Sequence, residues 1–70
     1  MVTIGTKPDC QPCKLTKMRL TKRGIPFTEV PVDELMDVAR EHNLMSAPVV
    51  VAPGGKVWSG YRPDEIDALV

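Results

Sequence analysis

Short apolar runs separated by polar and turn-forming residues predict strands and helices in alternation along the chain. Residues 2–4 form a β-branched run that ends at Gly5 and is typical of a first strand. After a loop, Pro12 suits the first turn of a helix, where its missing N–H costs nothing. We expect this helix to continue to Arg23, because Gly24 is a favourable residue just beyond a helix end.

The middle of the chain predicts a second strand and a second helix. Residues 27–32 alternate loosely between apolar and polar side chains, and Pro31 indicates an edge strand or a strand exit. Asp33 is a good N-cap for the helix that follows, and Asn43 suits the left-handed position at its end. The i, i+3, i+4, i+7 spacing predicts a buried face made of Leu35, Val38, Ala39 and His42.

The last third of the chain predicts a hairpin and a short helix. Residues 49–51 form an apolar strand, 53–55 a turn, and 56–58 a strand that pairs back. Gly60 ends that strand, and Pro63 begins the last helix. The inner face of this helix is expected to consist of Ile66, Leu69 and Val70.

The resulting order β-α-β-α-β-β-α is that of a small α/β fold. With 70 residues, the chain is long enough for one domain, which we place at 1–70. Such a short chain has a thin core, and methionine fills irregular core space well. We therefore expect Met18, Met36 and Met45 to be core residues.

The overall charge narrows the classes of partner. The formal net charge is +0, which argues against a general nucleic-acid binder. No apolar run approaches the roughly 18 residues of a membrane span, and the N-terminus does not read as a signal peptide. We therefore expect an intact cytoplasmic protein that contacts neither nucleic acid nor membrane.

The two halves of the chain carry opposite charge. Residues 1–28 hold six bases and one acid, whereas residues 29–70 hold eight acids and three bases. One interpretation is two solvated faces. The other is a basic surface around the first segment that steers acidic partners or anions.

The two cysteines, Cys10 and Cys13, are three residues apart. A disulfide-held scaffold would need more cysteines, spread along the chain. A zinc site would need two more soft ligands, and the chain has one histidine, so we expect no metal and no other cofactor. The spacing favours a redox pair, with a structural or metal-binding role as the alternative.

The place of Cys10 before a helix predicts a reactive thiol. Only a thiolate attacks a disulfide, and the N–H groups and dipole of a helix start favour one. Together with Lys7 and Lys14 they should lower the pKa of Cys10 below the free value of about 8.5. Cys13, one turn on, faces inward. We predict Cys10 as the exposed nucleophile and Cys13 as the buried resolving thiol, with Pro12 fixing the backbone between them.

Pro48 follows Ala47 and precedes an apolar strand. It is either a plain strand-entry proline or a cis-proline that faces the cysteines and leaves the preceding backbone free to pair with a substrate strand.

These features together resemble the thioredoxin fold in its short glutaredoxin-like form, over the whole chain. TKPDCQPC at 6–13 looks like the active-site loop of glutaredoxins and NrdH-type redoxins, in which Lys7, Gln11 and Pro12 would support the cysteines. SAPVV at 46–50 looks like their cis-proline segment, and with this resemblance we predict that Pro48 is cis and lies against the Cys10–Cys13 pair. WSGYRPD at 58–64 closely resembles the Trp-Ser-Gly-Phe-Arg-Pro-Asp signature of NrdH-type redoxins. The family more often has Gln directly before the second cysteine, where this chain has Pro12.

The resemblance implies a four-stranded mixed sheet flanked by three helices, and a partner surface near the cysteines. That surface would consist of Trp58, Ser59, Gly60, Tyr61, Arg62 and Asp64. Trp58 is equally well read as a core residue. The implied function is that of a monomeric thiol-disulfide oxidoreductase. It would donate electrons to the large subunit of class Ib ribonucleotide reductase and be recharged by thioredoxin reductase.

Two other functions are compatible with the same cysteine pair. The first is a glutathione-dependent glutaredoxin, although bulky Tyr61 and Arg62 would crowd a glutathione carboxylate. The second is a thiol-switch regulator resembling Spx, although those proteins carry a helical insert for which 70 residues leave no room.

Overall fold

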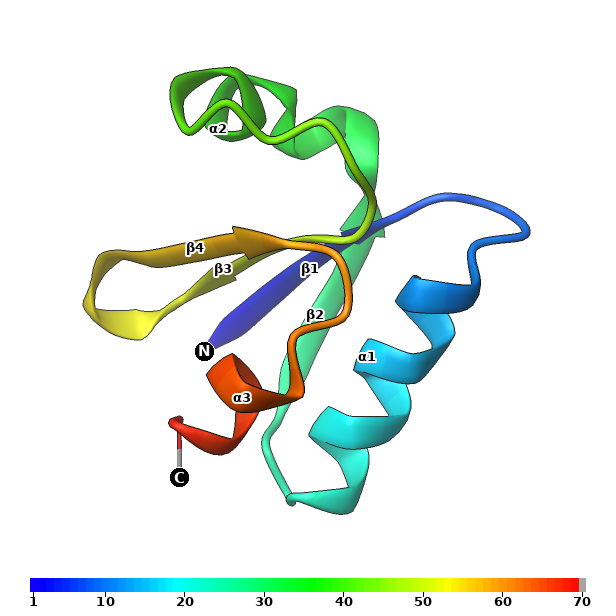
Figure 1. Cartoon of the computed structure of the whole chain (residues 1–70), viewed down its shortest axis with the longest axis vertical. Coiled ribbons are helices and arrows are strands. Elements are labelled where there is room, and N and C mark those ends of the chain that lie inside the picture. Colours follow the sequence, from blue (N-terminus) through cyan, green and yellow to red (C-terminus); the bar gives the residue numbers. More distant parts are fainter. Residues whose placement is uncertain (70) are drawn as a thin grey trace.

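The computed structural model describes residues 1–69, and its elements follow the predicted order (Figure 1). Val70, expected on the inner face of the last helix, lies outside the described residues. The elements are β1 (Val2–Thr6), α1 (Gln11–Lys22), β2 (Phe27–Pro31), the 3-10 helix η1 (Val32–Leu35), α2 (Met36–Glu41), β3 (Val49–Ala52), the 3-10 turn η2 (Pro53–Gly55), β4 (Lys56–Ser59) and α3 (Pro63–Asp67).

The four strands form one mixed sheet in the order β2-β1-β3-β4. β1 and β2 are parallel, whereas β3 is antiparallel to both β1 and β4. α1 and α3 lie on one side of this sheet and α2 lies on the other (Figure 1). The thioredoxin-like arrangement of a four-stranded mixed sheet with three helices is therefore confirmed. β2 is an edge strand and Pro31 is its last residue, as the sequence predicts.

The main core lies between the sheet and the pair α1 and α3. Side chains alternate across a strand, so Val2 and Ile4 of β1 share the face toward α1, and Trp58 of β4 lies opposite Val50 of β3. Full burial of one aliphatic side chain stabilises the fold by about 1.5–3 kcal/mol. The buried core residues are Val2, Ile4, Leu20, Val50, Ala52, Trp58 and Ile66.

The helix ends agree with the turn residues. Gly24 and Asn43 have φ values of 70° and 57°, the left-handed conformation that closes a helix. Pro63 is the first residue of α3, as predicted. Local chemistry of a few residues is enough to set these boundaries.

On the other face of the sheet, η1 lies close against β1 at Gly5. A Cβ at this position would lie 2.9 Å from Leu35 Cδ1 and 3.1 Å from Val32 Cα, both in η1. Only glycine therefore lets η1 lie directly on β1 without displacing it.

The predicted N-cap role of Asp33 is wrong. The chain turns into η1 directly after β2, so that Asp33 lies inside the first turn and no side chain caps it. α2 begins at Met36, again without a side-chain cap. The approach of Val32 and Leu35 to Gly5 explains the difference, because it starts the turn at Val32, one residue before the expected N-cap.

The predicted burial of His42 and of the three methionines is also wrong. α2 has six residues and ends at Glu41, so His42 lies beyond it and is exposed. Met18, Met36 and Met45 are 67%, 38% and 98% exposed. The branched and aromatic side chains fill the core without them.

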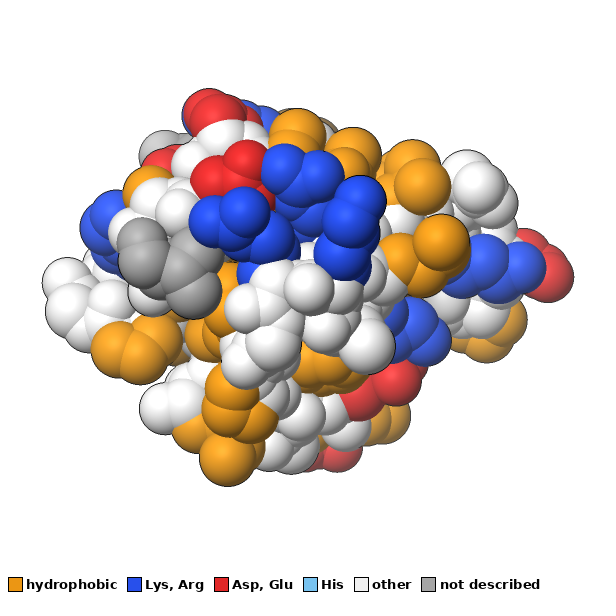
Figure 2. Space-filling view, turned by 90° about the horizontal axis from the view of Figure 1, so that it is seen from below, with side chains coloured by type: hydrophobic (Ala, Val, Ile, Leu, Met, Phe, Trp, Pro, Cys, Tyr) orange, Lys and Arg blue, Asp and Glu red, His pale blue; other side chains and the backbone are white. Residues whose placement is uncertain are grey.

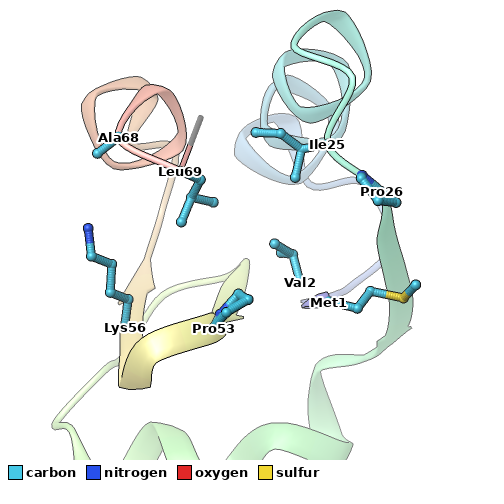
Figure 3. Close-up of a pocket in the computed structure, with 8 residues that line it drawn as sticks. All are labelled: Met1, Val2, Ile25, Pro26, Pro53, Lys56, Ala68 and Leu69. Carbon is cyan, nitrogen blue, oxygen red and sulfur yellow. The ribbon is translucent and has the colours of Figure 1, made fainter.

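An apolar pocket of about 390 Å³ opens where β1 begins (Figure 3). The cysteine loop follows the opposite end of β1, so this pocket is separate from the cysteines. Its lining residues are Met1, Val2, Ile25, Pro26, Pro53, Lys56, Ala68 and Leu69.

Candidate active site

Cys10 and Cys13 form a disulfide at the start of α1, with their Cα atoms 5.2 Å apart. Cys10 is the N-cap residue of α1, and Cys13 lies in its first turn. Cys13 is 2% exposed, as predicted, but Cys10 is only 6% exposed, so the expectation of an exposed Cys10 is wrong for this disulfide form. Bonding to an inward-facing partner draws the Cys10 sulfur toward the body of the protein.

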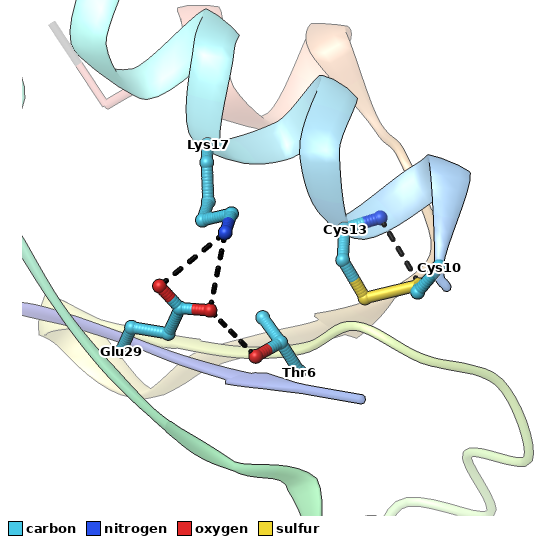
Figure 4. Close-up of polar contacts among 5 residues, drawn as sticks. All are labelled: Thr6, Cys10, Cys13, Lys17 and Glu29. Atoms are coloured by element: carbon cyan, nitrogen blue, oxygen red, sulfur yellow. Dashed lines mark hydrogen bonds and ion pairs between the residues drawn. A yellow bond between two sulfur atoms is a disulfide. The ribbon is translucent and has the colours of Figure 1, made fainter. Parts of the chain in front are cut away.

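The sulfur of Cys10 acts as the cap of α1. The Cys13 backbone N–H donates to Cys10 Sγ at 3.2 Å (Figure 4). A serine or aspartate oxygen accepts from the same position in an ordinary helix cap. After reduction, this donor and the positive end of the α1 dipole would both favour a thiolate at Cys10.

The turn between the cysteines is fixed from two sides. Pro12 stands where a helix needs no N–H donor. The hydroxyl of Thr16, which is wholly buried, donates to the Pro12 carbonyl at 2.8 Å. Sequence reasoning missed Thr16, although its position four residues after Pro12 is the spacing for such a bond.

Strand register gathers three segments at the cysteine end of the sheet. Gly5, at the end of β1, pairs with Val49, the first residue of β3, and Val49 pairs with Ser59, the last residue of β4. The loop that carries the cysteines, the residues before β3 and the residues after β4 therefore start from neighbouring points.

The segment before β3 contains a cis peptide bond between Ala47 and Pro48, as predicted. Pro48 is buried, and its carbonyl accepts a hydrogen bond of 2.9 Å from the backbone N–H of Gly60. This contact ties the segment after β4 to the proline loop. The sequence could not reveal it, because it joins residues on two different strand ends.

The residues after β4 divide between core and surface. Trp58 is 3% exposed and belongs to the core, which decides between its two interpretations. Tyr61 is half-buried against the same core. Arg62 is exposed and makes a two-bond ion pair with Asp64, from Nε at 3.2 Å and from Nη2 at 3.0 Å. The hydrogen bonds from Arg62 lower the pKa of the Asp64 carboxyl.

Lys7 and Gln11 are exposed on either side of the cysteine loop. Lys7 lines two hollows beside this loop, one shared with Glu29 of β2 and one shared with Ala47. Within residues 1–69, Lys7 takes part in no ion pair, so its charge stays free near the disulfide.

A polar network lies beside the cysteines. Glu29 of β2 accepts from the Thr6 hydroxyl at 2.7 Å and pairs with Lys17 of α1 at 3.2 Å (Figure 4). The hydrogen bond from Thr6, followed by that from Lys17, lowers the pKa of the Glu29 carboxyl. The network joins two strands and the helix that carries the disulfide. Sequence reasoning missed it because only the parallel register of β1 and β2 brings Glu29 close.

Within residues 1–69, no group of three histidine, cysteine or acidic residues is placed to hold a metal ion. None of the described helices is long and apolar enough to cross a membrane.

Comparison with known proteins relates this chain to glutaredoxin-like proteins. The glutaredoxin family model matches residues 2–58. The Gene 56 protein of Mycobacterium phage L5 is 44% identical over 73 residues, covering 99% of this chain and 71% of that protein. The glutaredoxin-like protein NrdH of Escherichia coli K12 is 39% identical over 71 residues, covering 97% of this chain and 86% of its own length.

The solved structure of the NrdH-redoxin from Escherichia coli superimposes with a TM-score of 0.84 at 39% identity, covering 99% of this chain and 93% of that one. That protein is described as glutaredoxin-like with a thioredoxin-like activity profile.

Proposed function

The chain belongs to the glutaredoxin family as an NrdH-type glutaredoxin-like redoxin, and from this premise we propose that it carries electrons to class Ib ribonucleotide reductase in the cytoplasm and is recharged by thioredoxin reductase. The observation that carries the proposal is the disulfide at the start of α1, in which the Cys13 N–H donates to Cys10 Sγ. This arrangement makes Cys10 the better leaving and attacking sulfur of the pair.

The exchange proceeds in two steps. In the reduced protein, the Cys10 thiolate attacks one sulfur of the client disulfide, forms a mixed disulfide and releases the other client sulfur as a thiolate. Cys13 then loses its proton and attacks the Cys10 sulfur, which releases the second client sulfur and closes the Cys10–Cys13 disulfide. Two electrons pass to the client, and its two thiolates take up two protons. The described structure corresponds to the oxidised product of this cycle.

The segment 59–64 supports a protein partner in preference to glutathione. The Arg62 guanidinium is already engaged by Asp64 through two hydrogen bonds. It is therefore not free to bind a glutathione carboxylate without breaking that pair. The Gly60 N–H is likewise occupied by the Pro48 carbonyl. A site whose donors are satisfied internally suits the flat surface of a larger protein.

Reduction of the oxidised protein by two reductants tests the proposal. Thioredoxin reductase with NADPH is compared with glutathione, glutathione reductase and NADPH, by the loss of NADPH absorbance. We expect fast reduction by thioredoxin reductase and slow reduction by glutathione. The reduced protein should then support turnover of class Ib ribonucleotide reductase, and Cys10→Ser should not.

Arg62→Ala should weaken the thioredoxin reductase reaction or open the site to glutathione, with little change in stability. Arg40→Ala is the matched control, because Arg40 is also exposed and also pairs with an aspartate, on α2. Rapid reduction by glutathione with no reaction at thioredoxin reductase would replace this proposal with the glutathione-dependent glutaredoxin.

A further inference from the structure

The outer surface of α1 is strongly basic. The helix contains four cations and no acidic residue, and Arg23 follows it directly. Figure 2 shows lysine and arginine side chains gathered in one patch, with acidic side chains at one edge and hydrophobic ones at another. The cations of α1 itself are Lys14, Lys17, Arg19 and Lys22.

Acidic residues from other elements neutralise one part of this surface. Glu29 of β2 pairs with Lys17, and Asp67 of α3 pairs with both Arg19 and Arg23. These pairs lie where α1 meets its neighbours. The charge that remains is therefore on the side of α1 that faces away from them.

Lys14, Met18 and Lys22 form a stripe along this remaining side, here called the α1 stripe. They are spaced four residues apart, so they lie above one another on the helix. All three are exposed, Met18 by 67%, and neither lysine has an ion pair within residues 1–69. An open hollow of about 370 Å³, lined by Lys17, Met18, Thr21 and Lys22, lies beside Met18.

The stripe begins one turn from the disulfide. At a rise of about 1.5 Å per residue, Lys14 lies roughly 6 Å and Lys22 roughly 18 Å along the helix from Cys10. An extended chain spans about 3.3–3.6 Å per residue. A client whose cysteine reaches Cys10 can therefore lay its next two to six residues along the stripe.

We propose that the α1 stripe is a docking site for an acidic segment of the protein with which Cys10 exchanges its disulfide. Carboxylates of that segment lie beside Lys14 and Lys22, and an aliphatic side chain between them packs on Met18. The inference rests on the proposed function, since only an exchange partner has a sulfur at Cys10. Charge complementarity of this kind raises the rate of encounter more than the final affinity.

A protein fits this site better than a nucleic acid does. The centre of the stripe is an apolar thioether, which offers nothing to a phosphate backbone. The chain as a whole has a net charge of +0, and η1 and α2 carry acids on the other side of the sheet. A long polyanion would meet repulsion there, whereas a short acidic segment would not.

Two synthetic peptide disulfides test the stripe without a physiological partner. Each is a disulfide-linked dimer of a short peptide with one cysteine. Asp, Leu and Asp stand two, four and six residues after the cysteine in one dimer, and Lys, Leu and Lys stand at the same positions in the other, so that the three side chains share one side of an extended chain. The protein is first reduced with dithiothreitol and freed from it, and chromatography follows the release of peptide thiol. Wild type should reduce the acidic dimer about tenfold faster at low salt. The preference should fade as salt shortens the screening length from about 30 Å at 0.01 M to about 3 Å at 1 M.

Lys22→Glu should abolish or reverse the preference. Lys22 is chosen because it is three turns from Cys10, too far to change the reactivity of the thiol itself. The rate at which uncharged iodoacetamide alkylates Cys10 should therefore stay unchanged. Lys56→Glu is the matched control, with the same charge change on β4, beside the apolar pocket of Figure 3, and it should leave the preference intact.

Equal rates for the two dimers, or equal effects of Lys22→Glu and Lys56→Glu, would overturn the inference and leave the proposed function standing. A preference removed by added duplex DNA would assign the stripe to nucleic acid instead. No reduction of either dimer would contradict the proposed function itself.

Discussion

The two sulfurs of the disulfide differ in their surroundings even though both are buried. Cys10 Sγ accepts the Cys13 N–H at the helix start, and Cys13 lies deeper, at 2% exposure against 6%. A hydrogen bond to sulfur and a helix dipole favour the thiolate, whereas burial disfavours it. We therefore expect the reduced protein to titrate and react first at Cys10.

Substitution of each cysteine tests this order. Cys13→Ser should accumulate stable mixed disulfides when it reacts with client disulfides, because no second thiol resolves them, and Cys10→Ser should lose exchange altogether. Mass spectrometry of the intact protein detects the adducts. Faster alkylation of Cys13 than of Cys10 in the reduced wild type would contradict the assignment.

Trp58 carries an unpaired donor in the core. Within residues 1–69, its Nε1 is the only fully buried side-chain nitrogen or oxygen without a hydrogen-bond partner. Trp58→Ala should cost about 3–5 kcal/mol of stability through the cavity it leaves. Trp58→Phe should cost about 1.5 kcal/mol or less, because loss of the unsatisfied donor offsets part of the lost contact. Urea unfolding followed by circular dichroism measures both, and a cost of Trp58→Phe well above about 1.5 kcal/mol would show that the indole N–H has a partner.

At the scale of elements, α1 and α3 are joined by charge. Asp67 of α3 accepts two hydrogen bonds from Arg19 of α1 and pairs with Arg23 just beyond it. The hydrogen bond from Arg19 lowers the pKa of the Asp67 carboxyl below its ordinary value of 3.8. These groups are largely solvated, so the pair contributes modestly.

The sign of this shift sets a pH dependence. A carboxyl with a lowered folded-state pKa stabilises the fold above its unfolded pKa, and that contribution is lost as the pH falls through the folded value. Asp67→Asn should therefore melt below wild type at pH 7, and the difference should shrink below about pH 3.8. Asp37→Asn is the control, because Asp37 is fully exposed and, among residues 1–69, its one ion pair is with Arg40 at 3.5 Å. A melting difference that is constant with pH would refute the role of the pair.

The contact between η1 and β1 depends on a missing side chain. Gly5→Ala would place a Cβ 2.9 Å from Leu35 Cδ1 and 3.1 Å from Val32 Cα. Overpacking of this kind should cost about 1–3 kcal/mol, measured by urea unfolding. The double change Gly5→Ala, Leu35→Ala should cost less than the sum of the two single changes, because shortening Leu35 removes the closest contact. Strict additivity would show that the backbone of Val32 carries the whole clash.

At the scale of the whole molecule, part of the negative charge lies on the side of the sheet away from α1, while Glu29 and the acids of α3 lie on the side of α1. Basic α1 lies on one side, and α2 with its adjoining η1 lies on the other (Figure 1). The acids on that second side are Asp33, Glu34, Asp37 and Glu41. With a net charge of +0, there is no overall repulsion between copies at pH 7.

This arrangement predicts weak attraction between copies in dilute salt and a monomer near physiological salt. The second virial coefficient from light scattering should be negative at about 10 mM salt and rise toward zero or above at about 150 mM, as screening removes the attraction. The Cα radius of gyration is 10.7 Å, close to the roughly 11 Å expected for one compact chain of this length. A larger particle that persists at 150 mM salt would contradict the monomer.

Much of this protein follows from its sequence alone, because the relevant forces act over a few residues. Hydrophobic periodicity, prolines and glycines predict the order of strands and helices. The pair Cys10 and Cys13 at a helix start predicts the redox chemistry. The motif at 58–64 indicates the family.

Tertiary structure alone decided the rest, because it depends on strand register and on packing between distant segments. The parallel pairing of β1 and β2 brings Glu29 to Thr6 and Lys17, and the pairing around Val49 brings Gly60 to the Pro48 carbonyl. Periodicity shows that a side chain is apolar but not whether a neighbouring element covers it. For that reason Trp58 is a core residue and Met18 a surface residue. The sheet and α3 enclose Trp58, whereas no element of the described chain packs over Met18.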